Sequence, residues 1–223
     1  MRLHLPVAAI ALLGAIAFAP SSARAQATFD FESLGLGART SLTTTDSGVT
    51  MTLTRENGSA FELSNINGAP GVPASYGSRT LDSFNNNVAD FYIASFDTQL
   101  SAFGFDFGDF EPSDDDVIEI RAYSGANGTG ALVGSTTVNQ SNLPPNSPVS
   151  FLPETVTYVP GGSFQSVLFR GGASGFPVSL YYDNFRVRQA VLVDPVPEPG
   201  AVAFGVVMGG GLLGLMVRRR RLS

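Results

Sequence analysis

The chain has 223 residues and contains no cysteine, no tryptophan and no lysine, which excludes disulfide bonds and Schiff-base chemistry. Between Gln26 and Val196, 18 acidic residues stand against seven arginines, a formal charge of −11. This balance excludes the clustered positive charge that nucleic-acid binding requires, but it permits divalent cations and neutral glycans as partners.

The first residues have the organisation of a secretory signal peptide. Arg2 precedes an apolar stretch from Leu5 to Ala19, and Ala23-Arg24-Ala25 provides the small residues of a signal-peptidase site. We therefore predict that residues 1–25 are removed and that the mature chain begins at Gln26. Removal takes away His4, the single histidine, so the mature chain keeps only carboxylate chemistry for catalysis.

From residue 26 to residue 189, short apolar segments alternate with Gly, Pro, Asn and Ser, without a helical period. Phe103, Phe105 and Phe107 share one face of an expected strand, opposite Gly104 and Asp106. We predict one all-β domain over residues 26–189. The expected strands are Thr28–Glu32, Val49–Arg55, Ala60–Leu63, Val88–Ser95, Leu100–Phe107, Val117–Tyr123, Ala131–Val138, Glu154–Val159, Phe164–Arg170 and Val178–Val187.

About ten strands separated by turn residues are typical of an antiparallel β-sandwich. A jelly roll is the preferred version, because two packed sheets enclose the many phenylalanines without helices, and an immunoglobulin-like sandwich is the alternative. Asn65–Asn87 and Asn139–Pro148 are expected to be irregular. Triplets of the glycosylation type begin at Asn57, Asn127 and Asn139, and we interpret them as turns in which Asn-Gly supplies positive φ.

Asp183 is the strongest single candidate for a site residue. In a regular strand its side chain points to the same face as Phe185 and Val187. A buried carboxylate needs a cation, an arginine or several backbone donors, so calcium binding and pairing with Arg186 or Arg170 both remain open.

A second group of carboxylates lies in the middle of the chain, where Asp109, Asp114 and Asp116 offer oxygen ligands for calcium. This segment lacks the ligand order of an EF-hand, so the alternative is an exposed connection between strands. A glycosidase needs two carboxylates facing each other across a cleft, and the sequence fixes no such distance. Tyr76 lies in an expected loop and is the candidate for stacking on a sugar.

The end of the chain has a different organisation. Residues 190–196 form an expected linker, followed by Pro197-Glu198-Pro199, an uncharged Gly-rich apolar run from Gly200 to Val217, and Arg218, Arg219, Arg220 and Arg221. Eighteen helical residues at about 1.5 Å each extend roughly 27 Å, enough to cross a bilayer core. The arginines favour the cytoplasmic side, so we predict a transmembrane helix that leaves residues 26–196 outside the inner membrane.

These last features, in this order, resemble the PEP-CTERM sorting signal of bacterial exopolysaccharide-associated proteins. The resemblance covers residues 197–223. It implies that an exosortase cuts the chain near Pro197-Glu198-Pro199 and releases or re-anchors the domain before it. An ordinary single-span anchor is the alternative.

Three further segments resemble PEP-CTERM ectodomains with a jelly roll similar to carbohydrate-binding modules. They are Phe29-Asp30-Phe31-Glu32, Phe105-Asp106-Phe107-Gly108-Asp109 and Tyr182-Asp183-Asn184-Phe185. The resemblance implies that the first and last strands lie near each other around a structural calcium, with Glu32 and Asp183 among its ligands.

Together these observations predict an exported bacterial surface or exopolysaccharide-matrix protein with a structural or adhesive domain and no enzymatic activity. Its expected partners are signal peptidase, exosortase, the inner membrane in passing, and extracellular polysaccharide. A glycan-binding module and a carboxylate-based glycoside hydrolase are the two alternatives.

Overall fold

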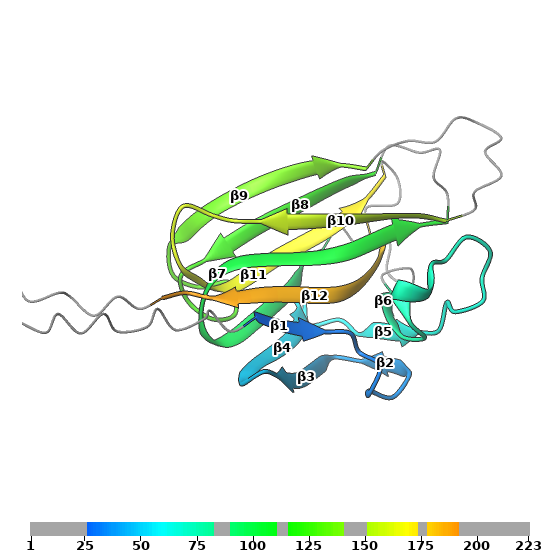
Figure 1. Ribbon diagram of the computed structural model, residues 1–223. Coiled ribbons are helices and arrows are strands. Elements are labelled where there is room, and N and C mark those ends of the chain that lie inside the picture. The colour runs from blue at the N-terminus through cyan, green and yellow to red at the C-terminus, as the bar shows by residue number, and fades with distance from the viewer. Residues whose placement is uncertain (1–25, 83–89, 111–115, 141–150, 174–177, 192–223) are drawn as a thin grey trace, which may run out of the picture.

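The computed structural model describes residues 26–82, 90–110, 116–140, 151–173 and 178–191 (Figure 1). The expected signal peptide, the Pro-Glu-Pro triplet, the terminal arginines and Asp114 lie outside these ranges. In the part that is described, no helix has both the length and the apolar character needed to cross a membrane.

The described residues form strands and a single turn of 3-10 helix, as the all-β prediction requires. Every strand pairing among them is antiparallel. The elements are β1 (Gln26–Phe29), β2 (Gly37–Arg39), β3 (Ser41–Asp46), β4 (Val49–Arg55), β5 (Phe61–Ser64), η1 (Ala74–Tyr76), β6 (Thr80–Asp82), β7 (Tyr92–Asp109), β8 (Val117–Tyr123), β9 (Leu132–Asn139), β10 (Leu152–Tyr158), β11 (Phe164–Gly172) and β12 (Tyr181–Gln189).

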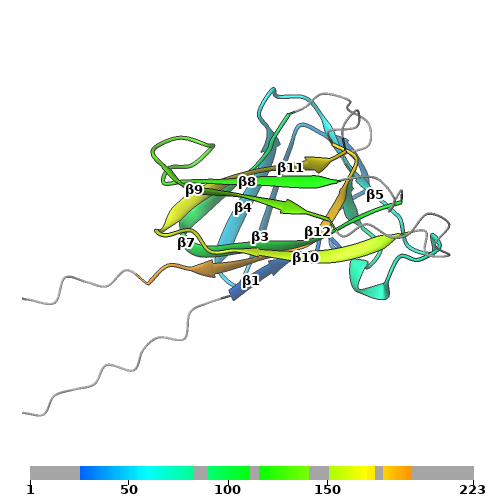
Figure 2. The ribbon, with the colours of Figure 1, turned by 90° about the horizontal axis from the view of Figure 1, so that it is seen from above.

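Two layers of strands share the long strand β7. In the first layer, the second half of β7 lies between β10 and β12. Strand β12 also pairs with β1 and with β6. Strand β6 then pairs with β5, and β5 with β2. In the second layer, the first half of β7 lies between β4 and β11, and this layer continues to β3 on one side and to β8 and β9 on the other. Figures 1 and 2 show β7 running through both layers.

Aromatic rings from both layers fill the space between them. Phe103, Phe105 and Phe107 of β7 are fully buried, as the predicted alternation requires. The Phe105 ring centroid lies 5.3 Å from that of Phe169 on β11 and 5.7 Å from that of Phe185 on β12. Rings at these separations contribute stabilisation beyond the area that they bury, so this aromatic core holds the two layers together.

The strand predictions are correct in kind and differ in detail. Strands β4 and β8 have the predicted bounds, whereas the two strands expected at Val88–Ser95 and Leu100–Phe107 form the single strand β7. Strand β3 is absent from the prediction because Leu42 is the only apolar residue in its threonine-rich sequence. A tight turn at Ser47 and Gly48, both at positive φ, folds β3 back onto β4.

The turn interpretation holds for two of the three Asn triplets. Gly58 has a φ of 74°, and Asn127 and Gly128 have φ values of 55° and 70°. Asn139 is instead the last residue of β9, and the rest of the segment expected to be irregular there is outside the described residues from residue 141 on.

The described part of Asn65–Asn87 is less irregular than predicted, because it contains η1 and β6. We call residues 65–79 the covering segment. Tyr76 and Ile66 of this segment pack with Phe151 in a small apolar cluster separate from the main core. The expected exposure of Tyr76 is wrong: it is 1% exposed, and its ring lies edge-on to Phe151 at 5.2 Å.

Candidate functional site

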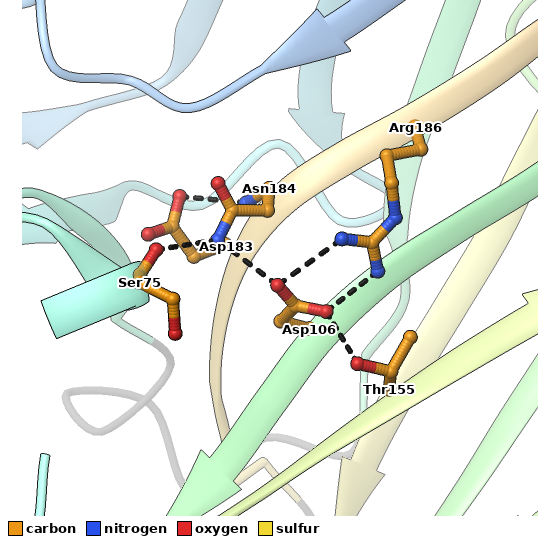
Figure 3. A network of polar contacts seen from close by, with 6 residues as sticks. All are labelled: Ser75, Asp106, Thr155, Asp183, Asn184 and Arg186. Atoms are coloured by element: carbon orange, nitrogen blue, oxygen red, sulfur yellow. Dashed lines mark hydrogen bonds and ion pairs between the residues drawn. The ribbon is translucent and has the colours of Figure 1, made fainter. Parts of the chain in front are cut away.

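A network of polar side chains lies on the outer face of β7 and β12, partly beneath the covering segment (Figure 3). The network depends on an irregularity in β12. Asn184 has a φ of 50°, and the pairing of β12 with β7 shifts register between Asp183 and Arg186. Asn is one of the few residues that tolerate this backbone region, so the bulge forms where the sequence provides it.

Because of the bulge, the side chain of Asp183 lies on the outer face of the sheet and not on the core side. Tyr182 is buried in the main core together with Phe185 and Val187, so two residues rather than one separate the inward side chains. Asp183 lies opposite Asp106 of β7 and shares the outer face with it. The predicted facing of Asp183 with Phe185 and Val187 is therefore wrong, because a strict two-residue period does not pass through a bulge.

Asp183 is nevertheless 1% exposed. The backbone N–H of Asn184 donates to its Oδ1 at 2.7 Å, whereas its Oδ2 is buried without a hydrogen-bond partner among the described residues. Burial raises the pKa of Asp183 to about 8, and the negative charges of Glu32, Asp30 and Asp106 add to this rise. The site therefore favours a proton or a cation on this carboxylate.

Glu32 lies beside Asp183 and holds the end of the covering segment. Its Oε1 accepts from the backbone N–H groups of Ser78 and Arg79 at 2.7 and 2.9 Å, and its Oε2 accepts from the Ser78 hydroxyl at 2.6 Å. Burial raises the pKa of Glu32, but these hydrogen bonds outweigh it and lower the pKa overall. Glu32 is therefore anionic. Its position beside Asp183 agrees with the expected nearness of the first and last strands.

Asp106 connects this region to the rest of the outer face. It accepts from Thr155 at 2.6 Å and from the side-chain amide of Asn184 at 2.9 Å, and it forms an ion pair with Arg186 at 2.5 Å. The same Asn184 amide donates to the Ser75 carbonyl at 2.8 Å. Burial raises the pKa of Asp106, but Arg186 and the other donors lower it overall.

Neither arginine considered as a partner of Asp183 pairs with it. Arg186 pairs with Asp106, and Arg170 pairs with Glu119 at 2.9 Å on the other layer. Asp109 and Asp116 are buried, at 5% and 2% exposure, whereas the acids that raise the pKa of Asp183 are Glu32, Asp30 and Asp106. Within the described ranges, no three or more His, Cys, Asp or Glu side chains are grouped to hold a metal ion.

A cavity of about 250 Å³ opens on the same outer face, at the end of the sandwich where β1 begins and β12 ends. None of the described residues that line it is acidic. No residue was predicted for this cavity, although Arg186 and Arg188 alternate with Phe185 and Val187 and so indicate a basic outer face of β12. The cavity is lined by Gln26, Ala102, Phe103, Gly104, Thr157, Val159, Arg186, Val187 and Arg188.

Comparisons with known proteins leave the family of the chain open. No family model and no curated protein matches it. Among solved structures, the K2 cleaved adhesin domain of Lys-gingipain has a TM-score of 0.49 at 12% identity, covering 74% of this chain and 99% of that chain. The K1 cleaved adhesin domain of Lys-gingipain from Porphyromonas gingivalis W83 has a TM-score of 0.41 at 13% identity, covering 70% and 99%.

A family 11 carbohydrate-binding module from Clostridium thermocellum, in complex with a mixed-linked tetrasaccharide, has a TM-score of 0.31 at 14% identity, covering 76% of this chain and 98% of that one. At identities of 12–14% and TM-scores of 0.49 or lower, these similarities carry no statement about function.

Proposed function

We propose that this chain is an exported bacterial surface or exopolysaccharide-matrix protein whose β-sandwich, with jelly-roll strand order, acts as a structural or adhesive domain and not as an enzyme. The proposal joins two kinds of support. The signal-peptide pattern and the terminal Pro-Glu-Pro, apolar and arginine segments indicate export and sorting. The described domain provides a surface for binding.

The observation that carries the adhesive role is the composition of the outer-face cavity. Glycoside hydrolysis needs two carboxylates about 5 to 10 Å apart on either side of the sugar, and this cavity has none in its described lining. It offers instead the amide of Gln26, the hydroxyl of Thr157 and the guanidinium groups of Arg186 and Arg188. These groups donate hydrogen bonds without reacting, which favours binding over hydrolysis.

A glycan-binding module is therefore the second candidate, and it uses the same cavity. The glycan contact that the sequence suggested, Tyr76, takes no part because its ring is buried. In this second candidate, the polar donors of the cavity would bind the sugar in place of an exposed aromatic ring.

A structural calcium is a further part of the proposal. Calcium takes six to eight oxygen ligands, including backbone carbonyls, and Asp183 offers a buried Oδ2 without a described partner beside the anionic Glu32. Glu32 already accepts three hydrogen bonds, so it would act mainly through its charge. Asp109, Asp114 and Asp116 stay a separate prediction, with Asp114 outside the described residues.

Sorting is tested with the full chain in a host that has an exosortase. Replacing Arg218, Arg219, Arg220 and Arg221 by Ser should reduce tail removal and recovery from the envelope or matrix, because the cytoplasmic end loses its charge. The matched control replaces all four by Lys, which keeps the charge and should keep the topology. Fractionation with mass spectrometry of the C-terminus gives the readout, and unchanged processing of the Ser variant would contradict the proposed sorting.

A further inference from the structure

The cavity beside Arg188 is a trough over β7, with longer side chains of β10 on one side and of β12 on the other. Gly104 lies opposite Thr157 on β10 and Arg186 on β12, and in the next row Ala102 lies opposite Arg188. Neighbouring strands are about 4.8 Å apart, so the side chains on β10 and β12 flank a gap of roughly 10 Å over small residues. This width suits a single sugar ring lying across β7.

The fold keeps the bottom of this trough free of side chains. A Cβ added at Gly104 would lie 2.6 Å from the Val156 carbonyl oxygen and 3.2 Å from Thr157 Oγ1. Distances this short to backbone would force β10 away from β7. Glycine is therefore required for the strand pairing, and the trough is a consequence of that pairing.

Arg188 is placed to hold an anionic group in this trough. Its Nε donates to the Ser101 hydroxyl at 3.3 Å, and no ion pair within the described residues includes it. Arg186, in contrast, is neutralised by Asp106 at 2.5 Å. Arg188 thus retains a guanidinium whose planar donors match a carboxylate.

The rest of the lining fits the other parts of a charged sugar. Gln26 lies opposite Arg188 on β1, and it provides an amide for sugar hydroxyls, as Thr157 does with its hydroxyl from the other side. Phe103, the one aromatic residue of the described lining, is 0% exposed, so stacking cannot supply the affinity. Recognition has to come from hydrogen bonds and charge.

The acidic character of the whole domain does not oppose such a ligand. Screening at physiological salt limits the effect of exposed charges to about 8 Å. The described lining carries two arginines and no acid, and Asp106, the carboxylate next to it, is paired with Arg186. The cavity of about 250 Å³ is smaller than the range of about 300 to 1,000 Å³ that holds drug-sized molecules, which suits one sugar unit of a longer chain.

We propose that this cavity binds a carboxylate-bearing sugar unit of an acidic polysaccharide, with the Arg188 guanidinium on the carboxylate and Thr157 and Gln26 on the hydroxyls. The proposal rests on the proposed adhesive function and names its ligand class. An anionic lipid headgroup shares the charge but not the ring of hydroxyls, and it is an alternative outcome of the test.

The test uses the full chain in an uncharged polyoxyethylene detergent and polygalacturonate as the probe, with binding measured by calorimetry. Fully methyl-esterified polygalacturonate is the matched probe, because it has the same sugar backbone without the charge. We expect the esterified polymer and Arg188→Gln each to weaken binding about 10- to 100-fold, as loss of a charge-assisted hydrogen bond implies. Arg188→Lys should retain part of the affinity, since it keeps the charge but not the planar donors.

Arg39→Gln is the control variant. It removes the same charge from β2, where the Arg39 guanidinium donates to the carbonyls of Gly35 and Gly37, and it should bind like the unaltered chain. Equal binding of both polymers, or full affinity in Arg188→Gln with an unchanged melting temperature, would overturn the proposal. Displacement of polygalacturonate by glycerol phosphate at equal charge concentration would also overturn it. That result would assign the cavity to a lipid headgroup.

Failure of the ligand class and failure of the proposed function give different results. A chain that binds dextran or the esterified polymer as tightly as polygalacturonate keeps an adhesive function and loses the acidic ligand. A chain that binds no polymer, and that fractionation does not find in the envelope or matrix, loses both.

Discussion

At the scale of single residues, Asp183 is a carboxylate that the fold removes from water almost completely. Its burial and three neighbouring acids oppose the charged form, and a single backbone N–H supports it. A position of this kind costs stability unless a proton or a cation occupies it. Protonation of Asp183 therefore stabilises the folded state.

The first prediction concerns the pH dependence of stability in the presence of a chelator. The folded-state pKa of Asp183, about 8, lies above its usual value of 3.8, so the native state holds a proton that the unfolded state has lost between these limits. The free energy of unfolding should therefore fall as pH rises from about 4 to about 8, and level off above that. Asp183→Asn should remove most of this slope and be more stable than the unaltered chain at pH 9.

Thermal unfolding at a series of pH values measures this slope. The titratable groups that act on Asp183 are Asp30, Glu32, Asp106 and Tyr76, and Asp183→Asn alters none of them. Asp97→Asn, which removes one charge from an exposed position, serves as the control and should keep the original slope. A flat profile in the unaltered chain would refute the prediction.

At the scale of elements, the covering segment and the bulge in β12 build the site together. The bulge turns Asp183 outward, and the covering segment then buries it, with Glu32 and Asn184 bonded to the segment's backbone. Neither element forms the buried position alone. The covering segment itself is held by a small apolar cluster around Tyr76 and Phe151.

The second prediction tests that the covering segment is held by apolar packing. The Tyr76 hydroxyl is buried without a hydrogen-bond partner in the described structure, and such a group costs about 1–3 kcal/mol. Tyr76→Phe removes the hydroxyl and keeps the ring against Phe151, so the free energy of unfolding should stay the same or rise by about 1 kcal/mol. Chemical denaturation of the full chain is the measurement.

The same substitution at Tyr92 is the matched control. The Tyr92 hydroxyl donates to the Asp82 carbonyl at 3.2 Å, so Tyr92→Phe should lower the free energy of unfolding by about 1 kcal/mol. A loss of stability in Tyr76→Phe as large as that in Tyr92→Phe would show that the Tyr76 hydroxyl has a bonding role.

At the scale of the whole molecule, the first and last strands pair along four residues, from Gln26 with Arg188 to Phe29 with Phe185. Asp183 and Glu32 lie just beyond this pairing, where the covering segment joins it. An ion bound there would connect the two ends of the fold and the covering segment. Its effect should therefore reach the unfolding of the entire domain.

The third prediction is a calcium-dependent melting temperature of the full chain. Calcium at a hundred times its dissociation constant adds about 2.7 kcal/mol, which corresponds to roughly 5 to 10 °C for a domain of this size. Asp183→Asn should abolish the shift. Magnesium, which prefers strict octahedral geometry, should give a smaller one. Equal melting temperatures with calcium and with chelator would dismiss the calcium proposal.

Local patterns in the sequence were enough for the class of the fold and for much of the strand set. Alternation of apolar residues depends only on neighbours two positions apart, and this is why Val49–Arg55 and Val117–Tyr123 have the predicted bounds and why Phe103, Phe105 and Phe107 face the core. Composition by itself likewise excludes disulfide bonds, because the chain has no cysteine.

The site depended on contacts between distant segments. The bulge at Asn184 reversed the side of the sheet predicted for Asp183, and packing against Phe151 buried Tyr76. The cavity formed because Gly104 and Ala102 lie between longer side chains of β10 and β12. The sequence alone determined which residues alternate, because that periodicity is local. Only the tertiary structure decided which side chains meet, because register, bulges and loop packing join residues far apart in the chain.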